Sequence, residues 1–246
     1  MAKRKSGGIL ETIKTIVYAV VIAVVIRTVA FEPFNIPSGS MIPTLLVGDY
    51  LFVSKFSYGY SRFSLPGFLE VPIHGRLFGT LPHRGDVAVF KLPRDNSTDY
   101  IKRIIGLPGD RIQVREGRLY INGTEAPRAP DGDYTVGGDG PAMIVKRFIE
   151  TLPNGVRHDI LKATDEGSAN NTQEYLVPPG HVFAMGDNRD NSEDSRFLNA
   201  VGFIPIENLV GRAEFIFFSV DAEAPWWEVW EWPFEIRFGR LFRGIH

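Results

Sequence analysis

Apolar residues are concentrated in one long run near the start of the chain. Between residues 9 and 30 the charged residues Glu11, Lys14 and Arg27 interrupt it, and its densest part is Ile16–Ile26. The densest part alone is too short to cross a hydrocarbon core of about 30 Å, which takes roughly 20 residues in a helix. The flanks supply the missing length, because Lys14 and Arg27 lie near the ends, where their charged groups can extend to the interface. The pattern therefore predicts a single transmembrane helix over residues 9–30.

The charges before this helix predict its orientation. Residues 1–8 hold three basic residues, and no acidic residue precedes Glu11. The positive-inside tendency then places residues 1–8 in the cytoplasm and the chain after residue 30 outside it. A cleaved signal peptide would also have a basic start and an apolar core. Only Thr28 and Ala30 form an alternate pair of the kind that precedes a cleavage site, and Thr is a poor substitute for Ala, so an uncleaved anchor is favoured.

Beyond residue 30 the pattern changes to short runs of β-branched and aromatic residues between Gly, Pro, Asn and Asp clusters. Such runs predict strands, and the absence of a long amphipathic helical pattern predicts a mostly β fold. The expected strands are Tyr50–Val53, Asp86–Leu92, Tyr100–Ile105, Arg111–Val114, Leu119–Ile121, Ala142–Glu150, Val182–Met185 and Ala213–Val220. Glu116-Gly117 predicts a tight hairpin, and Asn122-Gly123 repeats the turn signal a few residues later.

Composition along the chain predicts how this β region is divided. Residues 117–179 are richer in Gly, Asp, Asn and Pro and have fewer apolar runs. We expect them to form a smaller β-rich lobe inserted into a catalytic core made of residues 31–116 and 180–246. Within the core, residues 55–84 place aromatic side chains among Gly and Pro, which is typical either of an excursion near lipid or of an ordinary surface loop.

The C-terminal end mixes aromatic and basic residues. Its members are Trp226, Trp227, Trp230, Trp232, Phe234, Phe238 and Phe242 with Arg237, Arg240 and Arg243. This mixture suits a lipid headgroup interface, where amphipathic rings and cations both find partners. A terminal strand that packs on the core is the alternative.

Overall composition excludes several classes of function. The 246 residues are 44% hydrophobic and 23% charged, which is ordinary for a folded protein, and the net charge of -2 gives no case for nucleic acid as a partner. The chain has no cysteine, which excludes a thiolate nucleophile and any cysteine-ligated metal. The acidic run Met185–Arg196 suggests calcium, but counting Asp190 as the first loop position puts Ser195 and Val201 where Gly and Glu are needed. We therefore expect no metal and no other cofactor.

Ser40 is the candidate nucleophile. It lies between small residues in Pro37–Leu45, ten residues after Ala30, so an extended chain keeps it within about 35 Å of the apolar segment. A nucleophilic serine also needs a base and donors for the oxyanion. The histidines lie in expected loops or at the chain end without a recognisable triad motif. The Gly-x-Ser-x-Gly pattern is absent, and no Ser lies three residues before a Lys.

Lys102 is the candidate base. Period-two alternation over Tyr100–Gly106 puts Lys102 and Arg103 on opposite faces of a strand, so one of these adjacent cations must face an apolar side. Desolvation there would lower the lysine pKa from about 10.4 toward the range where a neutral amine accepts a proton. The alternative is a solvated lysine on an edge strand, which protects against aggregation.

Four segments, in order, resemble the conserved boxes of bacterial type I signal peptidases. They are Pro37–Leu45, Arg84–Phe90, Tyr100–Asp110 (YIKRIIGLPGD) and Met185–Arg196 (MGDNRDNSEDSR). The resemblance implies Ser40 as the nucleophile, Lys102 as the general base, Ser38 in the oxyanion hole, Ser192 as the hydroxyl that orients the lysine, and Asp194 and Arg196 as a supporting polar pair. Many relatives have two transmembrane helices where this sequence predicts one, and Phe197–Val201 lengthens the link before Gly202.

The resemblance implies a membrane-anchored serine endopeptidase that removes leader peptides from exported proteins, cutting after small residues. Its partners would be signal-peptide-bearing preproteins and the phospholipid bilayer, close to the export translocon. It would lie in the bacterial inner (plasma) membrane with the catalytic domain on the periplasmic or outer face. Two alternatives stay open: another Ser-Lys hydrolase such as a self-cleaving repressor, and a non-enzymatic membrane-anchored β-domain in which Ser40 is a turn residue.

Overall fold

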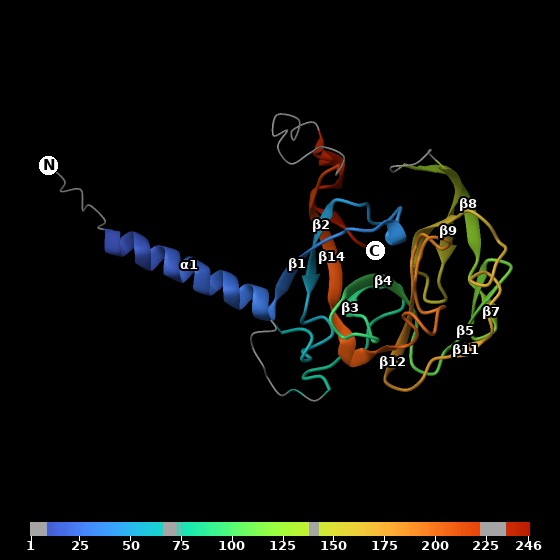
Figure 1. Ribbon diagram of the computed structural model, residues 1–246, viewed down its shortest axis with the longest axis horizontal. Helices are drawn as coiled ribbons and strands as arrows, with labels where there is room; N and C mark the ends of the chain where they lie inside the picture. Colours follow the sequence, from blue (N-terminus) through green and yellow to red (C-terminus); the bar gives the residue numbers. More distant parts are fainter. Residues whose placement is uncertain (1–8, 66–72, 74, 138–142, 222–234) are drawn as a thin grey trace.

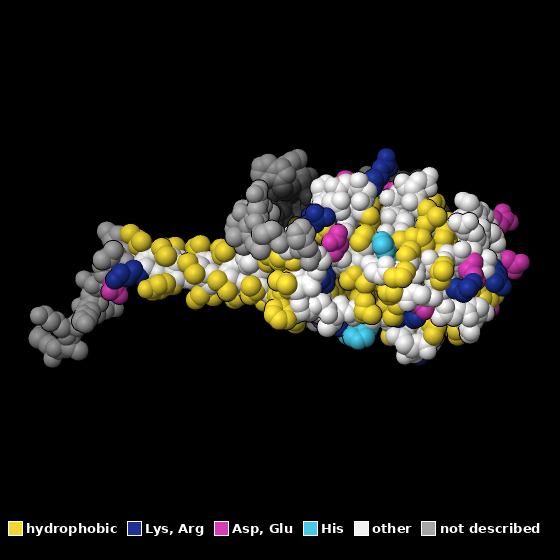
Figure 2. Space-filling view, turned by 90° about the horizontal axis from the view of Figure 1, so that it is seen from below, with side chains coloured by type: hydrophobic (Ala, Val, Ile, Leu, Met, Phe, Trp, Pro, Cys, Tyr) yellow, Lys and Arg dark blue, Asp and Glu magenta, His cyan; other side chains and the backbone are white. Residues whose placement is uncertain are grey.

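A single helix projects from a body made almost entirely of strands (Figure 1). The computed structural model describes residues 9–65, 73, 75–137, 143–221 and 235–246. Helix α1 (Ile9–Val29) matches the predicted segment, and its apolar side chains are not gathered into one stripe. Figure 2 shows them along the face of the helix in view. Within the described residues, Glu11–Val29 is the only helix whose length and mean hydropathy of 1.9 suit a membrane span. None of this span is buried against the protein. A leader sequence at the N-terminus would meet the same criteria.

The body confirms the predicted mostly β class. Its strands are β1 (Phe31–Asn35), β2 (Asp49–Ser54), β3 (Val87–Lys91), β4 (Asp99–Gly106), β5 (Arg111–Arg115), β6 (Arg118–Ile121), β7 (Thr124–Glu125), β8 (Arg128–Val136), β9 (Met143–Thr151), β10 (Arg157–Lys162), β11 (Tyr175–Leu176), β12 (His181–Met185), β13 (Ile204–Pro205), β14 (Leu209–Ser219) and β15 (Arg243–Gly244). The short 3₁₀ turns η1 (Gly39–Met41), η2 (Ile206–Asn208) and η3 (Phe238–Arg240) join some of them.

The largest sheet contains Lys102, and the turn that holds Ser40 packs against it. Its order is β1-β2-β14-β3-β4-β12-β13, and β15 adds to β14. Strand β4 lies between β3 and β12 and is therefore not an edge strand. Buried side chains from β2, β3 and β14, such as Leu51, Val89 and Ile216, form a core that also takes in Met41 beside Ser40. The turn that holds Ser40 is thereby fixed to the sheet by its apolar neighbour.

The other strands form two smaller sheets, ordered β11-β5-β6-β7 and β10-β9-β8. The predicted hairpin is confirmed, because β5 pairs with β6 through a turn in which Glu116 and Gly117 both have positive φ, 48° and 68°. Asn122 and Gly123 likewise turn the chain between β6 and β7, with φ of 54° and 80°. The expected boundary between residues 116 and 117 falls inside the first hairpin. The division into a core and an inserted lobe stays a prediction.

Three of the longer strands were not predicted, and two of them contain local strand breakers. Strand β1 includes Pro33 and lies at the end of its sheet, where a missing amide hydrogen is tolerated. Strand β8 includes Pro130 and Gly132, and its pairing with β9 shifts register between Pro130 and Asp133. Strand β10 (Arg157–Lys162) contains no such breaker, but only Ile160 and Leu161 of its six residues are apolar.

The structure describes only part of the two aromatic segments. In the 55–84 segment, Tyr58 is buried and donates to Asp86 Oδ2 at 3.0 Å, whereas Phe78 is 87% exposed. Phe68 lies outside the described residues, as do Trp226, Trp227, Trp230, Trp232 and Phe234 of the C-terminal mixture. In its described part, Phe238 and Phe242 are exposed, while Arg240 turns inward and forms an ion pair with Asp49 at 2.5 Å. Lipid contact by either segment stays a prediction.

Candidate active site

Ser40 and Lys102 lie together, although they come from different elements. Ser40 is in η1, shortly after β1, and Lys102 is in β4, opposite Ala88 of β3. Lys102 Nζ donates to Ser40 Oγ at 2.6 Å, and the two residues are only 4% and 9% exposed. Because Lys102 is buried in the central part of the sheet, the alternative of a solvated edge-strand lysine is wrong.

Burial of Lys102 changes its acidity. Desolvation lowers the pKa of its ammonium to about 8, even though the carboxylates of Asp194, Asp187 and Glu193 favour the charged form. The ring of Tyr100, on the same face of β4, lies 5.4 Å from Nζ. A lysine with this pKa is neutral in a substantial fraction of molecules near neutral to mildly alkaline pH.

Arg103, on the opposite face of β4, is also buried. The sequence required at least one of the two adjacent cations to face an apolar side, and the structure buries both: Arg103 is 0% exposed and pairs with Asp187. Arg103 Nε and Nη2 donate to the two Asp187 carboxylate oxygens at 2.9 and 2.7 Å, and Thr44 Oγ1 donates to the same carboxylate at 2.5 Å. Burial raises the pKa of Asp187, but the Arg103 guanidinium more than offsets this and holds the pKa below its usual value. The pair stays ionised and joins β4 to the loop after β12.

The loop after β12 clamps the turn that holds Ser40. Asn188 N donates to Ser40 O at 3.1 Å, and Asn188 Nδ2 donates to Gly39 O at 3.0 Å. A Cβ added to Gly186 would lie 2.2 Å from Ser192 Oγ and 2.6 Å from Ser40 O, so only glycine allows this close approach. The predicted hydrogen-bonded loop is therefore present, and Asn188 and Gly186 are site residues that the sequence reasoning did not single out.

The other predicted residues of this loop form a buried group. Asp194 is 0% exposed, and its Oδ2 accepts hydrogen bonds from Ser192 Oγ at 2.8 Å and Gly186 N at 3.0 Å. Arg196 Nη2 and Nε donate to the two Asp194 oxygens, each at 2.9 Å. Within the described residues, Ser192 bonds to Asp194 rather than to Lys102. The role of Ser192 in orienting the lysine stays a prediction.

Ser38 lies beside the serine–lysine pair. Its Oγ is 3.5 Å from Ser40 Oγ, and both side chains face a cavity of about 360 Å³. The cavity is lined by Phe34, Asn35, Ile36, Pro37, Ser38, Ser40, Val89, Asp99, Tyr100, Ile101, Lys102 and Glu193. One wall is the segment before η1 and the other is the first half of β4, which leaves room for an extended peptide against Ser40.

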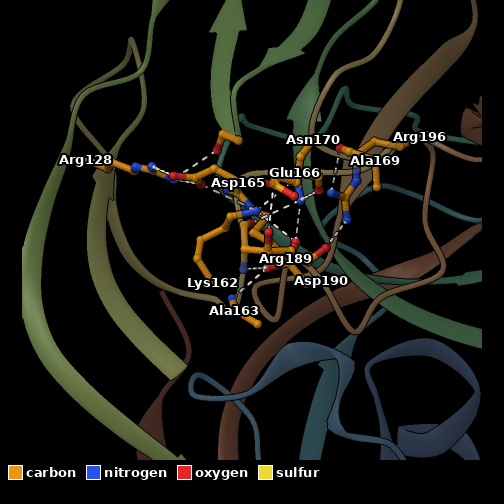
Figure 3. Close-up of polar contacts among 12 residues, drawn as sticks. Arg128, Lys162, Ala163, Asp165, Glu166, Ala169, Asn170, Arg189, Asp190 and Arg196 are labelled. Atoms are coloured by element: carbon orange, nitrogen blue, oxygen red, sulfur yellow. Dashed lines mark hydrogen bonds and ion pairs between the residues drawn. The ribbon is translucent and has the colours of Figure 1, made fainter. Parts of the chain in front are cut away.

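A second polar network ties the loop to the neighbouring sheet (Figure 3). Lys162, at the end of β10, is 3% exposed and donates to Asp190 Oδ1 at 2.8 Å and Asn170 Oδ1 at 2.5 Å. Asp190 Oδ2 accepts from the backbone amides of residues 163 and 164, and Arg196 Nη2 donates to Arg189 O at 2.5 Å. The loop is held from both sides, by the large sheet and by the segment after β10.

His158 does not lie in a loop, as the sequence suggested, but in β10 and fully inside the protein. Its Nε2 is 3.5 Å from Glu150 Oε2, and Glu150 forms a bidentate pair with Arg189. Burial lowers the pKa of His158 to about 4, so the ring is neutral at physiological pH. Within the described part of the chain, its ring makes no hydrogen bond with Ser40 or any other side chain.

A serine hydroxyl bonded to a buried lysine beside an open cavity is an arrangement that suits nucleophilic catalysis. The model of the family described as signal peptidase, peptidase S26, matches residues 9–218. The chain therefore belongs to this signal peptidase family and is a serine endopeptidase. Nowhere in the described residues do three or more His, Asp or Glu side chains gather as they would to hold a metal ion.

Known relatives resemble the chain over nearly its whole length. Signal peptidase I of Rickettsia typhi is 41% identical, over 93% of this chain and 91% of the relative. Signal peptidase I of Rickettsia canadensis is 40% identical, over 95% and 92%. A crystal structure of a signal peptidase I from Enterococcus faecalis is 25% identical, and the match covers 54% of this chain and 97% of that chain with a TM-score of 0.31.

Proposed function

We propose that this chain is a membrane-anchored endopeptidase that removes leader peptides from exported proteins, with Ser40 as nucleophile and Lys102 as general base. Membership of the signal peptidase family supports the removal of signal peptides by a peptidase. The contact of 2.6 Å between Lys102 Nζ and Ser40 Oγ carries the assignment of the dyad. The lowered lysine pKa adds to it, because a general base works best with a pKa near the operating pH.

The proposed reaction has two stages that use the same lysine. Neutral Lys102 accepts the Ser40 proton as Oγ attacks the carbonyl carbon of the scissile bond, and the Ser38 hydroxyl and the Ser40 amide donate to the oxyanion. The resulting ammonium gives its proton to the leaving amine. Lys102 then takes a proton from a water molecule that attacks the acyl-enzyme, and the expelled Oγ recovers that proton.

Membrane anchoring would serve this reaction by holding enzyme and substrate at the same surface. The family is membrane-anchored in bacteria, and α1 ends only two residues before β1 begins. A preprotein held by its own apolar segment would present its cleavage site close to Ser40, which lowers the entropy cost of the encounter. We propose the orientation given by the basic N-terminus, with the catalytic body on the outer face near the export translocon, and cleavage after small residues.

Incubating the purified chain in detergent with a synthetic leader peptide tests this function directly. We expect one cut, after a small residue, identified by mass spectrometry of the products. A serine-acylating probe separates the alternatives, since an inert β-domain would not be labelled and a Ser-Lys hydrolase of another kind would be labelled without cutting the leader peptide. Labelling that persists in Ser40→Ala would exclude Ser40 as the nucleophile.

Ser38→Ala is expected to slow cleavage by about 10²- to 10³-fold, because one donor to the oxyanion is lost. The loss should be in kcat, measured by initial rates on the leader peptide, with little change in KM. Ser168→Ala, at an exposed position far along the chain, is the matched control and should leave the rate unchanged. A Ser38→Ala variant as active as this control would remove Ser38 from the oxyanion hole.

The pH profile follows from the lysine pKa. Below about 8 most Lys102 is an ammonium that accepts no proton, so kcat/KM should fall about tenfold per pH unit toward acid. Above that pH the amine is neutral and the rate should level off. Rates measured from about pH 6 to pH 10 on the leader peptide check this, and a flat profile with chemistry limiting would contradict a lysine base.

A further inference from the structure

The carboxylate of Glu193 lies at the rim of the catalytic cavity. Its neighbours in sequence, Ser192 and Asp194, turn into the protein, whereas Glu193 is exposed. Its side chain lines the 360 Å³ cavity that contains Ser40, and also a shallower hollow of about 410 Å³ formed with Phe197 and Ala200. Glu193 therefore lies on the boundary between the cavity that contains Ser40 and this second hollow.

Glu193 differs from the other acids around this site because it has no partner in the part of the chain that the structure describes. Asp187 and Asp194 each pair with an arginine, and Asp99, on the far rim of the same cavity, pairs with Lys91 at 2.9 Å. Among the described residues, the Glu193 carboxylate makes no hydrogen bond and no ion pair. An exposed carboxylate without an ion pair among these residues adds negative potential at the mouth of the cavity.

The charge of Glu193 affects the pKa of two side chains that line the cavity, Tyr100 and Lys102. Burial raises the pKa of the Tyr100 hydroxyl, and Glu193 adds to that increase. Burial lowers the pKa of Lys102, and Glu193, together with Asp194 and Asp187, acts in the opposite direction. Tyr100 and Lys102 share one face of β4, so the carboxylate must lie on the cavity side of that strand.

We propose that Glu193 selects substrates with a cationic side chain next to the small residues of the cleavage site. This inference rests on the proposed function and deepens it by naming a class of substrate. A lysine or arginine at such a position would pair with Glu193, while an aspartate or glutamate would be repelled. Since both groups are partly solvated, the pairing is modest, and we expect about a three- to tenfold preference for Lys over Glu.

The test compares synthetic leader peptides that carry Lys, Gln or Glu at one position. One set varies the residue between the two small residues before the cut, and a second set varies the residue directly after it. The ratio of kcat/KM for the Lys and Glu peptides is measured for the wild type, Glu193→Gln and Glu166→Gln. Glu166 is an exposed glutamate outside the cavity and serves as the control.

We expect the ratio to be about three to ten in at least one set, to fall to near one in Glu193→Gln, and to be unchanged in Glu166→Gln. The wild-type preference should also weaken in about 0.5 M salt, where exposed charges are screened. Equal rates for all peptides, or the same ratio in Glu193→Gln as in the wild type, would overturn the role of Glu193 and leave the proposed function intact. No cleavage of any peptide by the wild type would overturn both.

Discussion

Lys102→Met is expected to reduce cleavage of a leader peptide to background while the protein stays folded. Methionine has a similar length and suits the buried site, but its thioether accepts no proton from Ser40 at neutral pH. Ser40→Ala should have the same effect, because the nucleophilic oxygen is removed. The double variant should be no slower than either single variant, since groups that act as one unit are strongly non-additive. Product formation over hours, followed by mass spectrometry, measures all three.

Two controls make this result specific. Lys146→Met removes a lysine from β9 that is largely exposed and paired with Asp133, and it should leave the rate unchanged. Thermal unfolding followed by circular dichroism should show that the Lys102→Met fold is intact, because replacing a desolvated ammonium with an apolar chain does not cost stability. Near-normal turnover in either single variant would refute the dyad.

Asp187→Asn is expected to destabilise the protein by about 3–5 kcal/mol, the usual result of leaving a buried charge without its partner. Asparagine keeps the size of the side chain but not the charge that Arg103 meets at 2.7 Å. Urea unfolding in detergent, followed by circular dichroism, measures the free energy of unfolding. Activity should fall as well, because Asp187 belongs to the loop that clamps Ser40.

The matched control is Asp133→Asn, which breaks an exposed ion pair with Lys146 and should cost less than about 1 kcal/mol. Replacing both partners, as in Arg103→Met with Asp187→Leu, should recover part of the lost stability, since no isolated charge remains. Arg103 Nη1 also donates to Gly85 O at 2.7 Å. An Asp187→Asn variant as stable as the control would show that this bond and the new asparagine satisfy Arg103 without a carboxylate.

The helix and strands that the sequence predicted correctly are those whose local residue pattern favours the same structure as their surroundings in the folded protein. Helix α1 and strands such as β3 and β12 are apolar enough that no other assignment competes. Strand β1 (Phe31–Asn35) was missed because Pro33 argues against a strand when the sheet position is unknown. The burial of Arg103 was not foreseen, because its partner Asp187 is 84 residues away in sequence and spacing gives no sign that the two meet.

The sequence predicted those residues of the candidate site whose side chains are of a type that can perform the reaction. Ser40 and Lys102 were singled out by small neighbours, strand alternation and resemblance, and the structure brings them together. Asn188 was not, because its contribution consists of hydrogen bonds to the carbonyls of Gly39 and Ser40, which any donor in that place would make. The glycine at position 186 was the available signal, since a glycine in a polar loop often marks a close backbone approach.

The junction between α1 and the body leaves little slack. Tyr60 donates to Val29 O at 2.6 Å, and β1 begins two residues after the helix ends. With α1 in a bilayer, Ser40 would lie at a nearly constant height above the lipid. The distance between the bilayer surface and the bond that is cut would therefore be nearly fixed. Bonds at that height would be cut in preference to identical sequences placed nearer to or farther from the membrane.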